Sequence, residues 1–201
     1  STARMFSVLD GRLPARPGVG GINFSGGENT MCADTCARYG IDLPAFRAAT
    51  AEALRAVLPS YATASNPLDA TTTLFTEDEK VRALFAAISA DPGVGLITLG
   101  DDVGQMSEPK DFTCARIMGE LSREGALLPA VIIPSFEKPR NPDLTAQFEA
   151  AGIPVLSTGD LAYQAVRHLL DFAAYDPAAV TLELAMPERA PEGEPHALSE
   201  A

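Results

Sequence analysis

Residues 20–40, GGINFSGGENTMCADTCARYG, decide how the chain folds, because they join a short apolar run to an amphipathic helix through a glycine pair. The apolar run predicts a strand over residues 19–24, and the pattern after it predicts a helix over residues 28–39. Gly40 ends that helix, since glycine adopts the left-handed conformation of a helix cap at little cost. A strand that turns directly into a helix is typical of parallel α/β sheets.

The alternation of strands and helices continues along the rest of the chain. Further helices are expected over residues 48–59, 76–91, 111–125, 142–152 and 160–175, and further strands over residues 93–100, 128–135 and 153–158. Thr76 and Glu79 form a capping box at the start of one of these helices. The strands are unbroken apolar runs, which indicates a sheet that is covered on both faces. We therefore predict a doubly wound parallel sheet of flavodoxin-like size, a three-layer α/β/α domain over residues 19–175.

The two ends of the chain differ from this domain. Residues 1–18 are interpreted as a connector from a preceding domain, in which the end of a helix precedes a Pro/Gly-rich connection. Residues 176–201 are rich in Pro and Glu and poor in large apolar side chains, so we expect a linker there.

Composition narrows the class of function. The chain has 201 residues, of which 46% are hydrophobic, and this suits a domain with a buried core. Its formal net charge of −12 argues against a nucleic-acid surface and against binding to anionic membranes. No run resembles a signal peptide or reaches the roughly 18 apolar residues of a membrane span, so a cytoplasmic location is expected.

The three cysteines and two histidines do not suggest a metal site. Cys32, Cys36 and Cys114 are an odd number, so they imply no disulfide framework. Cys32 and Cys36 lie one helical turn apart, and a metal or redox pair is one interpretation of them. Because no histidine is near them, we favour buried thiols on the apolar stripe of a helix. His168 is expected within the last helix and His196 in the solvated tail.

The loop SGGEN, residues 25–29, is the first candidate ligand site, because ligands of open parallel sheets bind beyond the carboxyl ends of the strands. Its glycines let backbone N–H groups approach a ligand closely, and the following helix adds the positive end of its dipole. That arrangement suits an anion such as phosphate or a carboxylate. The alternative is a plain turn in which Ser25 caps the helix.

Two further loops carry polar side chains. The loop ASNPLDATTT, residues 64–73, gathers Asn66, Asp69, Thr71 and Thr72 around a proline that imposes an extended or turn geometry on the residue before it. This loop is either part of a ligand pocket or a polar turn that caps the next helix. The loop LGDDVGQ has adjacent acids, for which we favour solvated side chains over a Mg²⁺ site, and we assign no metal.

These pieces follow one another in an order that resembles a known family. The stretch from NFSGGEN through GIDLP and AEALRAVLP to NPLDAT is similar to the second ligase-type domain of the NDP-forming acyl-CoA synthetases. This is the acetate–CoA ligase group of the succinyl-CoA synthetase superfamily, and DPGVGLITL, LPAVIIP and FEAAGIPVLSTGDLAYQAVRHLLDFAAY fit the same domain. The resemblance covers about residues 5–176, and the closing HALSEA looks like the lead-in to an ATP-grasp domain.

The resemblance implies a ligase that forms acyl-CoA from an acid, CoA and ATP or GTP through a phosphohistidine. It implies that the helix start steadies the phosphohistidine, with phosphate contacts from Ser25, Gly26, Gly27, Glu28 and Asn29. The pocket for a small carboxylic acid or acyl phosphate would include Asn66, Pro67, Asp69, Thr71 and Thr72. CoA-binding and ATP-grasp domains or subunits would be its partners, and a homodimer is a further alternative. ATP, Mg²⁺ and CoA would be cofactors of the complete enzyme, and none of them of this domain alone.

The chain lacks the reactive histidine of that family, which lies in a Ser-His-Thr-Gly segment. His168 and His196 lie in other contexts, so we assign no catalytic residue and expect the isolated chain to be inactive. Two functions of other classes are kept as alternatives. One is a flavodoxin-like domain that binds a phosphate cofactor, and the other is an interaction or dimerisation module without catalysis.

Overall fold

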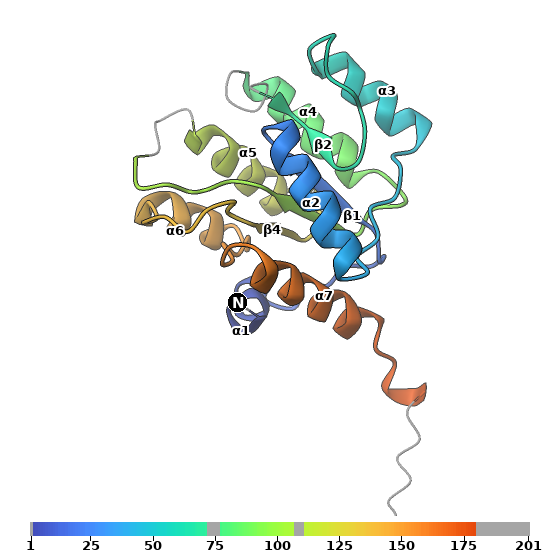
Figure 1. Cartoon of the computed structure of the whole chain (residues 1–201), viewed down its shortest axis with the longest axis vertical. Coiled ribbons are helices and arrows are strands. Elements are labelled where there is room, and N and C mark those ends of the chain that lie inside the picture. The colour runs from blue at the N-terminus through green and yellow to red at the C-terminus, as the bar shows by residue number, and fades with distance from the viewer. Residues whose placement is uncertain (1, 72–76, 107–110, 180–201) are drawn as a thin grey trace, which may run out of the picture.

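A parallel sheet forms the centre of the molecule (Figure 1). Within residues 2–71, 77–106 and 111–179, which the computed structural model describes, the sheet has four strands in the order β2-β1-β3-β4. Their bounds are β1 Val19–Asn23, β2 Leu68–Asp69, β3 Leu96–Leu99 and β4 Ala130–Ile132. All neighbours are parallel, and Ile22 of β1 pairs with Leu68 on one side and with Leu99 on the other.

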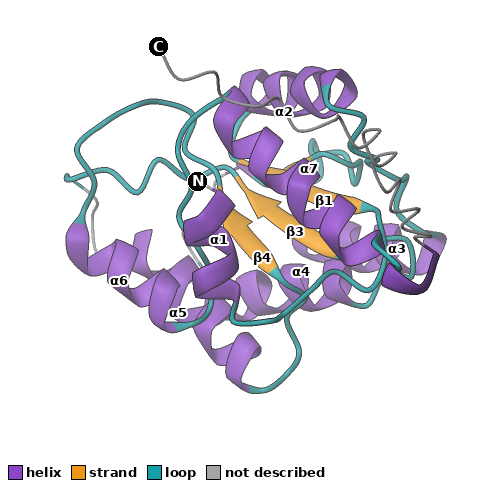
Figure 2. Ribbon diagram, turned by 90° about the horizontal axis from the view of Figure 1, so that it is seen from below, coloured by secondary structure: helices purple, strands orange, loops and turns teal. Residues whose placement is uncertain are grey.

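Helices cover both faces of the sheet (Figure 2). Their bounds are α1 Thr2–Leu9, α2 Gly26–Arg38, α3 Ala48–Val57, α4 Asp78–Ser89, α5 Asp111–Arg123, α6 Pro142–Ala150 and α7 Asp160–Ala174, and a 3₁₀ turn follows at Pro177–Ala179. One face carries α1, α2 and α7, and the other carries α3 to α6. In the described parts of the chain, no helix is long and apolar enough to cross a membrane.

Two hydrophobic cores divide the apolar residues of β1, β3 and β4 between them. On β3, Ile97 and Leu99 pack against the layer of α3 to α6, whereas Leu96 faces the layer of α1, α2 and α7. Successive side chains of a strand point to opposite faces, so a strand that is covered on both faces is apolar throughout. The prediction of a parallel sheet between two helical layers is confirmed.

Two predictions about strands are wrong. The stretch over residues 64–73 was expected to be a loop, but it contains β2, which pairs with β1 at one edge of the sheet. Residues 153–158 were expected to form a strand, but they form a single bridge between Val155 and Ile132.

The end of the sheet at Val155 is closed by an arginine side chain. The guanidinium of Arg140 donates to the carbonyl oxygens of Val155 and Leu156, the second at 2.5 Å. Pro154 offers no backbone N–H to a neighbouring strand. A short, covered edge of this kind gives no template for pairing with a further strand.

Helix ends lie within a turn of their predicted positions, but their caps are partly different. Asn141 caps α6, because its Oδ1 accepts hydrogen bonds from the N–H groups of Asp143 and Leu144, each at 3.0 Å. The predicted capping box before α4 includes Thr76, which lies outside the described residues, and α4 begins directly after Glu77.

The start of the chain packs onto the domain through α1. Met5 and Leu9 are buried in the core that α1 shares with α7, and Phe6 meets the ring of Phe172 edge to face at 5.2 Å between centroids. Residues 2–9 are therefore part of the folded unit. That residues 1–18 connect to a preceding domain stays a prediction, and most of the predicted linker over 176–201 lies outside the described residues.

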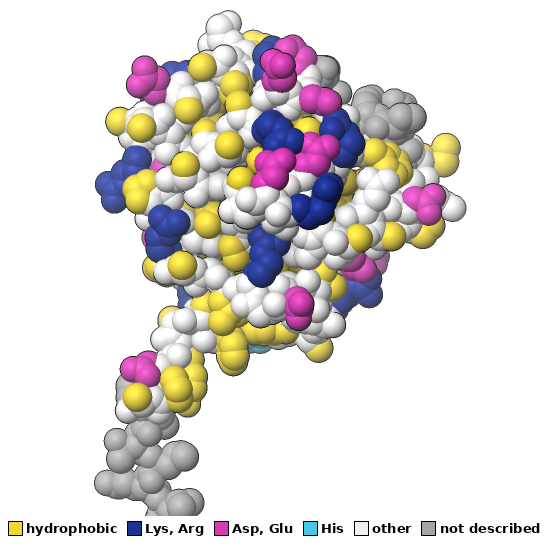
Figure 3. Space-filling view, turned by 180° about the vertical axis from the view of Figure 1, so that it is seen from behind, with side chains coloured by type: hydrophobic (Ala, Val, Ile, Leu, Met, Phe, Trp, Pro, Cys, Tyr) yellow, Lys and Arg dark blue, Asp and Glu magenta, His cyan; other side chains and the backbone are white. Residues whose placement is uncertain are grey.

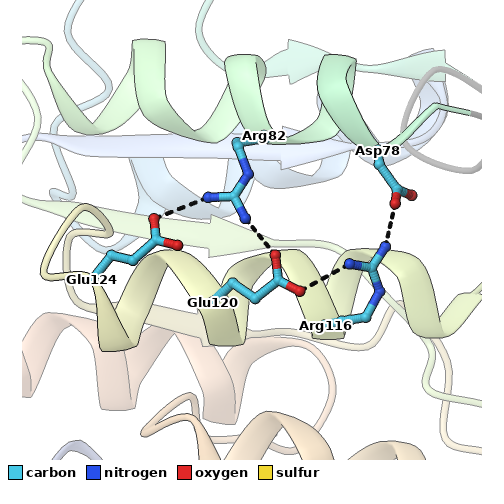
Figure 4. Close-up of polar contacts among 5 residues, drawn as sticks. All are labelled: Asp78, Arg82, Arg116, Glu120 and Glu124. Carbon is cyan, nitrogen blue, oxygen red and sulfur yellow. Dashed lines mark hydrogen bonds and ion pairs between the residues drawn. The ribbon is translucent and has the colours of Figure 1, made fainter.

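Ion pairs join α4 to α5 on the outer surface, where acidic and basic side chains lie side by side (Figure 3). The chain of contacts runs through Asp78, Arg116, Glu120, Arg82 and Glu124 (Figure 4). Arg116 lies 2.5 Å from Asp78 and 2.9 Å from Glu120. Because the two arginines are 38% and 45% exposed, we expect each pair to contribute about 1 kcal/mol or less.

Asp91 is a buried carboxylate that holds two loops together. It accepts hydrogen bonds from the N–H groups of Arg47 and Gly93, each at 2.8 Å. Burial alone raises the pKa of Asp91, but these hydrogen bonds and one from Thr50 outweigh it, so the pKa is lowered overall. A lowered pKa stabilises the fold fully above the unfolded value of about 3.9, and this contribution is lost as the pH falls through the folded-state pKa.

We expect Asp91→Asn to lower the free energy of unfolding by roughly 2–4 kcal/mol at pH 7, because each carboxylate oxygen accepts from a different N–H group and an amide keeps only one of these two acceptors. Urea unfolding at pH 7 and at pH 3 measures the effect, and the gap between wild type and variant should narrow at pH 3. Asp34→Asn, on the exposed side of α2, is the control and should change little. A gap of equal size at both pH values would contradict the role of the charge.

Candidate functional site

The carboxyl ends of the strands meet at one edge of the sheet. β1 lies between β2 and β3, and the chain passes from β1 to β2 on one side before it reaches β3 on the other. A reversal of strand order of this kind opens a crevice in which doubly wound sheets bind ligands. The loops that begin at Phe24, Ala70 and Gly100 leave the sheet at this edge.

Ser25 caps α2 and shares its hydrogen bonds with Glu28. The Ser25 Oγ accepts a hydrogen bond from the Glu28 N–H at 3.3 Å, and its hydroxyl donates to Glu28 Oε2 at 3.2 Å. The same carboxylate oxygen accepts from the Phe24 N–H at 3.1 Å, much as in a capping box. Of the described residues, none accepts a hydrogen bond from the N–H of Gly26 or Gly27.

The space beside these two glycines is open. A Cβ atom on Gly26 would meet nothing closer than Asp69 Oδ2 at 3.9 Å, and one on Gly27 nothing closer than Ser25 Oγ at 4.0 Å. The first N–H groups of a helix and the positive end of its dipole together attract anions. The start of α2 therefore offers both the donors and the room for an anionic group.

The Glu28 carboxylate also ties α2 to the loops after β3 and β4. Its Oε1 accepts a hydrogen bond from the Ser135 hydroxyl at 3.0 Å. Asp102 holds the same loop, since it accepts from the N–H groups of Ser135 and Phe136 at 2.9 and 3.2 Å and from Lys138 Nζ at 2.7 Å. These contacts fix the wall of the crevice opposite the start of α2.

Asn29 is positioned by an amide on the strand below it. Asn23 Nδ2 donates to Asn29 Oδ1 at 2.8 Å, and Asn29 Nδ2 donates to the Pro67 carbonyl at 3.1 Å. A Cβ atom on Gly100 would lie 2.3 Å from Asn23 Oδ1, so glycine leaves the room that Asn23 occupies. Asn23 was not predicted as a site residue, because in the sequence it is a single amide at the end of an apolar strand.

Asn66 holds the segment before β2 against the side of β1. Its Oδ1 accepts from the Gly21 N–H at 3.0 Å, and its Nδ2 donates to the carbonyl oxygens of Val19 and Pro44 at 2.8 and 2.9 Å. These partners place the amide beside the middle of β1 rather than at the crevice. Its predicted contact with an acid substrate stays a prediction.

Two loops beside β1 repeat the same turn. Asp69 Oδ1 accepts from the Thr71 N–H at 2.9 Å after β2, and Asp101 Oδ1 accepts from the Val103 N–H at 2.8 Å after β3. Thr71 and Val103 have φ of +52° and +47°, a region that β-branched residues rarely enter. Each carboxylate thus supports a strained turn on one side of the crevice. Thr72, also predicted in the acid pocket, lies outside the described residues.

The two adjacent acids after β3 accept backbone hydrogen bonds, Asp101 from its own loop and Asp102 from the loop after β4. In residues 2–71, 77–106 and 111–179, no group of three or more His, Cys, Asp or Glu side chains is placed to hold a metal ion.

A small pocket of about 40 Å³ lies beside the first turns of α2. Its wall includes Asn23, Glu28, Met31, Cys32, Ser135 and Tyr163. The pocket thus draws on β1, α2, α7 and the loop after β4. Cys32 and Cys36 are buried free thiols, as predicted, and the first of them lines this pocket.

Solved structures show which known proteins are similar to this chain. PH0766 from Pyrococcus horikoshii OT3 is 22% identical with a TM-score of 0.71, over 86% of this chain and 39% of the other. A dinucleotide-forming acetyl-coenzyme A synthetase 1 from Ca. Korarchaeum cryptofilum, in complex with phosphate and ADP, is 17% identical with a TM-score of 0.66. The match covers 87% of this chain and 37% of the synthetase chain. The chain shares their fold. It spans about two fifths of the length of these proteins. No protein-family model and no curated protein sequence matches it.

Proposed function

We propose that the chain is the ligase-type domain of an NDP-forming acyl-CoA synthetase, in which the start of α2 steadies a phosphoryl group. The observation that carries the proposal is the pair of open N–H groups of Gly26 and Gly27, at the point where the strand order reverses. The shared fold with an acetyl-coenzyme A synthetase that is described with phosphate and ADP supports the reaction class. The order of the NFSGGEN and NPLDAT motifs supports it independently.

The residues at the start of α2 fit a phosphoryl group. The N–H groups of Gly26 and Gly27 and the positive end of the dipole lie at the same helix start, where the space beside both glycines is open. Preorganised donors of this kind contribute about 3 kcal/mol each where charge develops. The Ser25 hydroxyl is engaged by Glu28, so the amides rather than this hydroxyl would hold the phosphoryl oxygens. The Glu28 carboxylate accepts three hydrogen bonds, which disperses the negative charge beside the site.

The loop after β2 would face the acid substrate. Asp69 lies beside Gly26, and its turn holds Thr71 at the edge of the crevice. The phosphohistidine, the CoA site and the nucleotide site with Mg²⁺ would come from other domains or subunits of the complete enzyme. In this arrangement the chain contributes one wall of the acyl phosphate site and supplies no catalytic residue.

The complete enzyme is expected to convert ATP to ADP, or GTP to GDP, over repeated turnovers only when a carboxylic acid and CoA are both present, because phosphorylation of the histidine by itself releases one equivalent of nucleoside diphosphate. A coupled assay for nucleoside diphosphate, run over a panel of short-chain and aromatic acids, measures this requirement, and chromatography of the products identifies the acyl-CoA. The 201-residue chain alone is the control and should give no product.

The nucleotide product distinguishes this class of ligase from others. Release of AMP and pyrophosphate would contradict the proposal, because a phosphohistidine relay transfers a single phosphoryl group. Turnover of nucleotide without acid and CoA would contradict it as well.

A further inference from the structure

The Cys32 sulfur lies at the floor of the pocket beside α2. It packs over β1, where a Cβ atom on Gly21 would come within 3.1 Å of Sγ. The side chain is only 2% exposed, but it lines the pocket of about 40 Å³ together with Asn23 and Tyr163. One water molecule needs about 10–15 Å³ by this measure, so the pocket admits a molecule slightly larger than water.

Hydrogen-bond donors surround this thiol. Hydrogen bonds from Cys36 above all, and from Tyr163 and Asn23, lower the pKa of Cys32 to about 7, although burial opposes them. The hydrogen bond with Cys32 is the main reason why the pKa of Cys36 is raised. The pKa of Tyr163 is raised mainly by burial and, to a smaller extent, by the charge of Cys32. Both partners therefore keep their protons at neutral pH and donate them to the Cys32 sulfur.

The charged groups on the elements around Cys32 are engaged in hydrogen bonds or ion pairs with other residues. On α2, Glu28 lines the same pocket, and its carboxylate accepts the hydrogen bonds described above. On α7, Asp160 pairs with Arg38 of α2 at 2.9 Å. The strand β1 and the loop after β4 contribute Asn23 and Ser135, which do not titrate.

The other two cysteines have different surroundings. Burial, and then the charge of Asp101, raises the pKa of Cys114, which lies in the core 3.7 Å from the Met118 sulfur. Cys36 lies four residues after Cys32 on one helix, where Cβ atoms are about 5–6 Å apart, and a disulfide needs about 4 Å. Cys36 is therefore a donor to Cys32 rather than a disulfide partner.

We propose that Cys32 is a peroxide-reactive thiol that small oxidants reach through this pocket. The sulfur attacks one oxygen of hydrogen peroxide, and the S–O bond forms as the O–O bond breaks. Hydroxide leaves and takes up from solvent the proton that the thiol released on ionising, which gives water. The sulfur thus loses two electrons to the peroxide and becomes a sulfenic acid. A thiol reductant reverses this product. The inference is independent of the proposed ligase function, because it concerns the chain's own residues.

Trapping of the sulfenic acid tests the proposal on the 201-residue chain. The folded protein is treated with hydrogen peroxide in the presence of dimedone, and the adduct is located by fragmentation of the peptide that carries both Cys32 and Cys36. The expected adduct is on Cys32, with Cys114 unmodified until the protein is unfolded. An adduct on Cys114 at the same rate, or none on Cys32 before unfolding, would overturn the proposal.

A matched pair of variants tests the role of Cys36. Cys36→Ser keeps a donor, and Cys36→Ala removes it, so the midpoint of the rate against pH should stay near 7 in the first and rise by about one unit or more in the second. At pH 7 a rise of one unit should make the alanine variant react about twofold more slowly, because the thiolate fraction falls about fivefold while its nucleophilicity rises about threefold. Tyr163→Phe, which keeps the buried ring, should shift the midpoint in the same direction. If the wild type, Cys36→Ser, Cys36→Ala and Tyr163→Phe all gave the same dependence of rate on pH, the role of these hydrogen-bond donors would be contradicted.

Discussion

Gly95→Ala is expected to prevent stable folding, with a loss of roughly 4 kcal/mol or more in the free energy of unfolding. A Cβ atom on Gly95 would lie 2.0 Å from the Arg16 carbonyl oxygen and 2.8 Å from the Arg16 backbone nitrogen. These are backbone atoms, so no side-chain rotamer relieves the clash. The Gly95 N–H also donates to the Gly18 carbonyl at 2.8 Å, directly before the first parallel pair of β1 and β3, Val19 and Leu96. The clash therefore disturbs the pairing of the two central strands.

A graded set of glycine substitutions separates this clash from the general effect of alanine. A Cβ atom on Gly20 would lie 2.9 Å from a methyl group of Ile88, which can shift, and one on Gly104 would meet nothing within 4 Å. Urea unfolding followed by circular dichroism should rank Gly104→Ala near wild type, Gly20→Ala below it and Gly95→Ala lowest. If Gly95→Ala were as stable as Gly104→Ala, the close approach of Gly95 to the Arg16 backbone would be wrong.

The central part of the fold could be predicted because its signals are local. The apolar runs of β1, β3 and β4 and the helical period of α7 lie within single short windows of sequence. The two-residue strand β2 has no such run, since its pairing with Ile22 and Asn23 rather than its own pattern makes it a strand. The close approach of Gly95 to Arg16 and Gly18 joins residues far apart in the chain, so no sequence window contains it.

The candidate site was predictable where it depends on turn chemistry. A glycine pair between a strand and a helix indicates the start of α2 at the edge of the sheet, and the structure places it there. The roles of Asn23, Asn66 and Ser135 depend on partners from other loops, and an amide or hydroxyl in sequence does not show which partner it has. Asn66 was grouped with Asp69 by proximity in sequence, whereas its hydrogen bonds lie along β1.

Gly27→Leu is expected to lower the acid- and CoA-dependent activity of the complete enzyme by about 100-fold or more, which corresponds to the loss of one or two preorganised donors. A side chain at this position would extend into the open space that the Gly26 and Gly27 amides face. Gly27 lies in the first turn of α2 with ordinary helical geometry, so leucine also removes the cost of a helical glycine. The midpoint of urea unfolding should therefore stay within the range of the wild type.

Two comparisons make this loss specific to the amides. Ala37→Leu adds a side chain of the same kind to the exposed last turn of the same helix, and it should leave the activity unchanged. Gly27→Ala adds only the Cβ, which would lie 4.0 Å from Ser25 Oγ, and should fall between wild type and Gly27→Leu. Full activity of a folded Gly27→Leu enzyme would mean that the phosphoryl group does not approach these amides. The start of α2 would then be a capped turn held by Ser25 and Glu28, and the proposed role of the helix would fail even if the enzyme formed acyl-CoA.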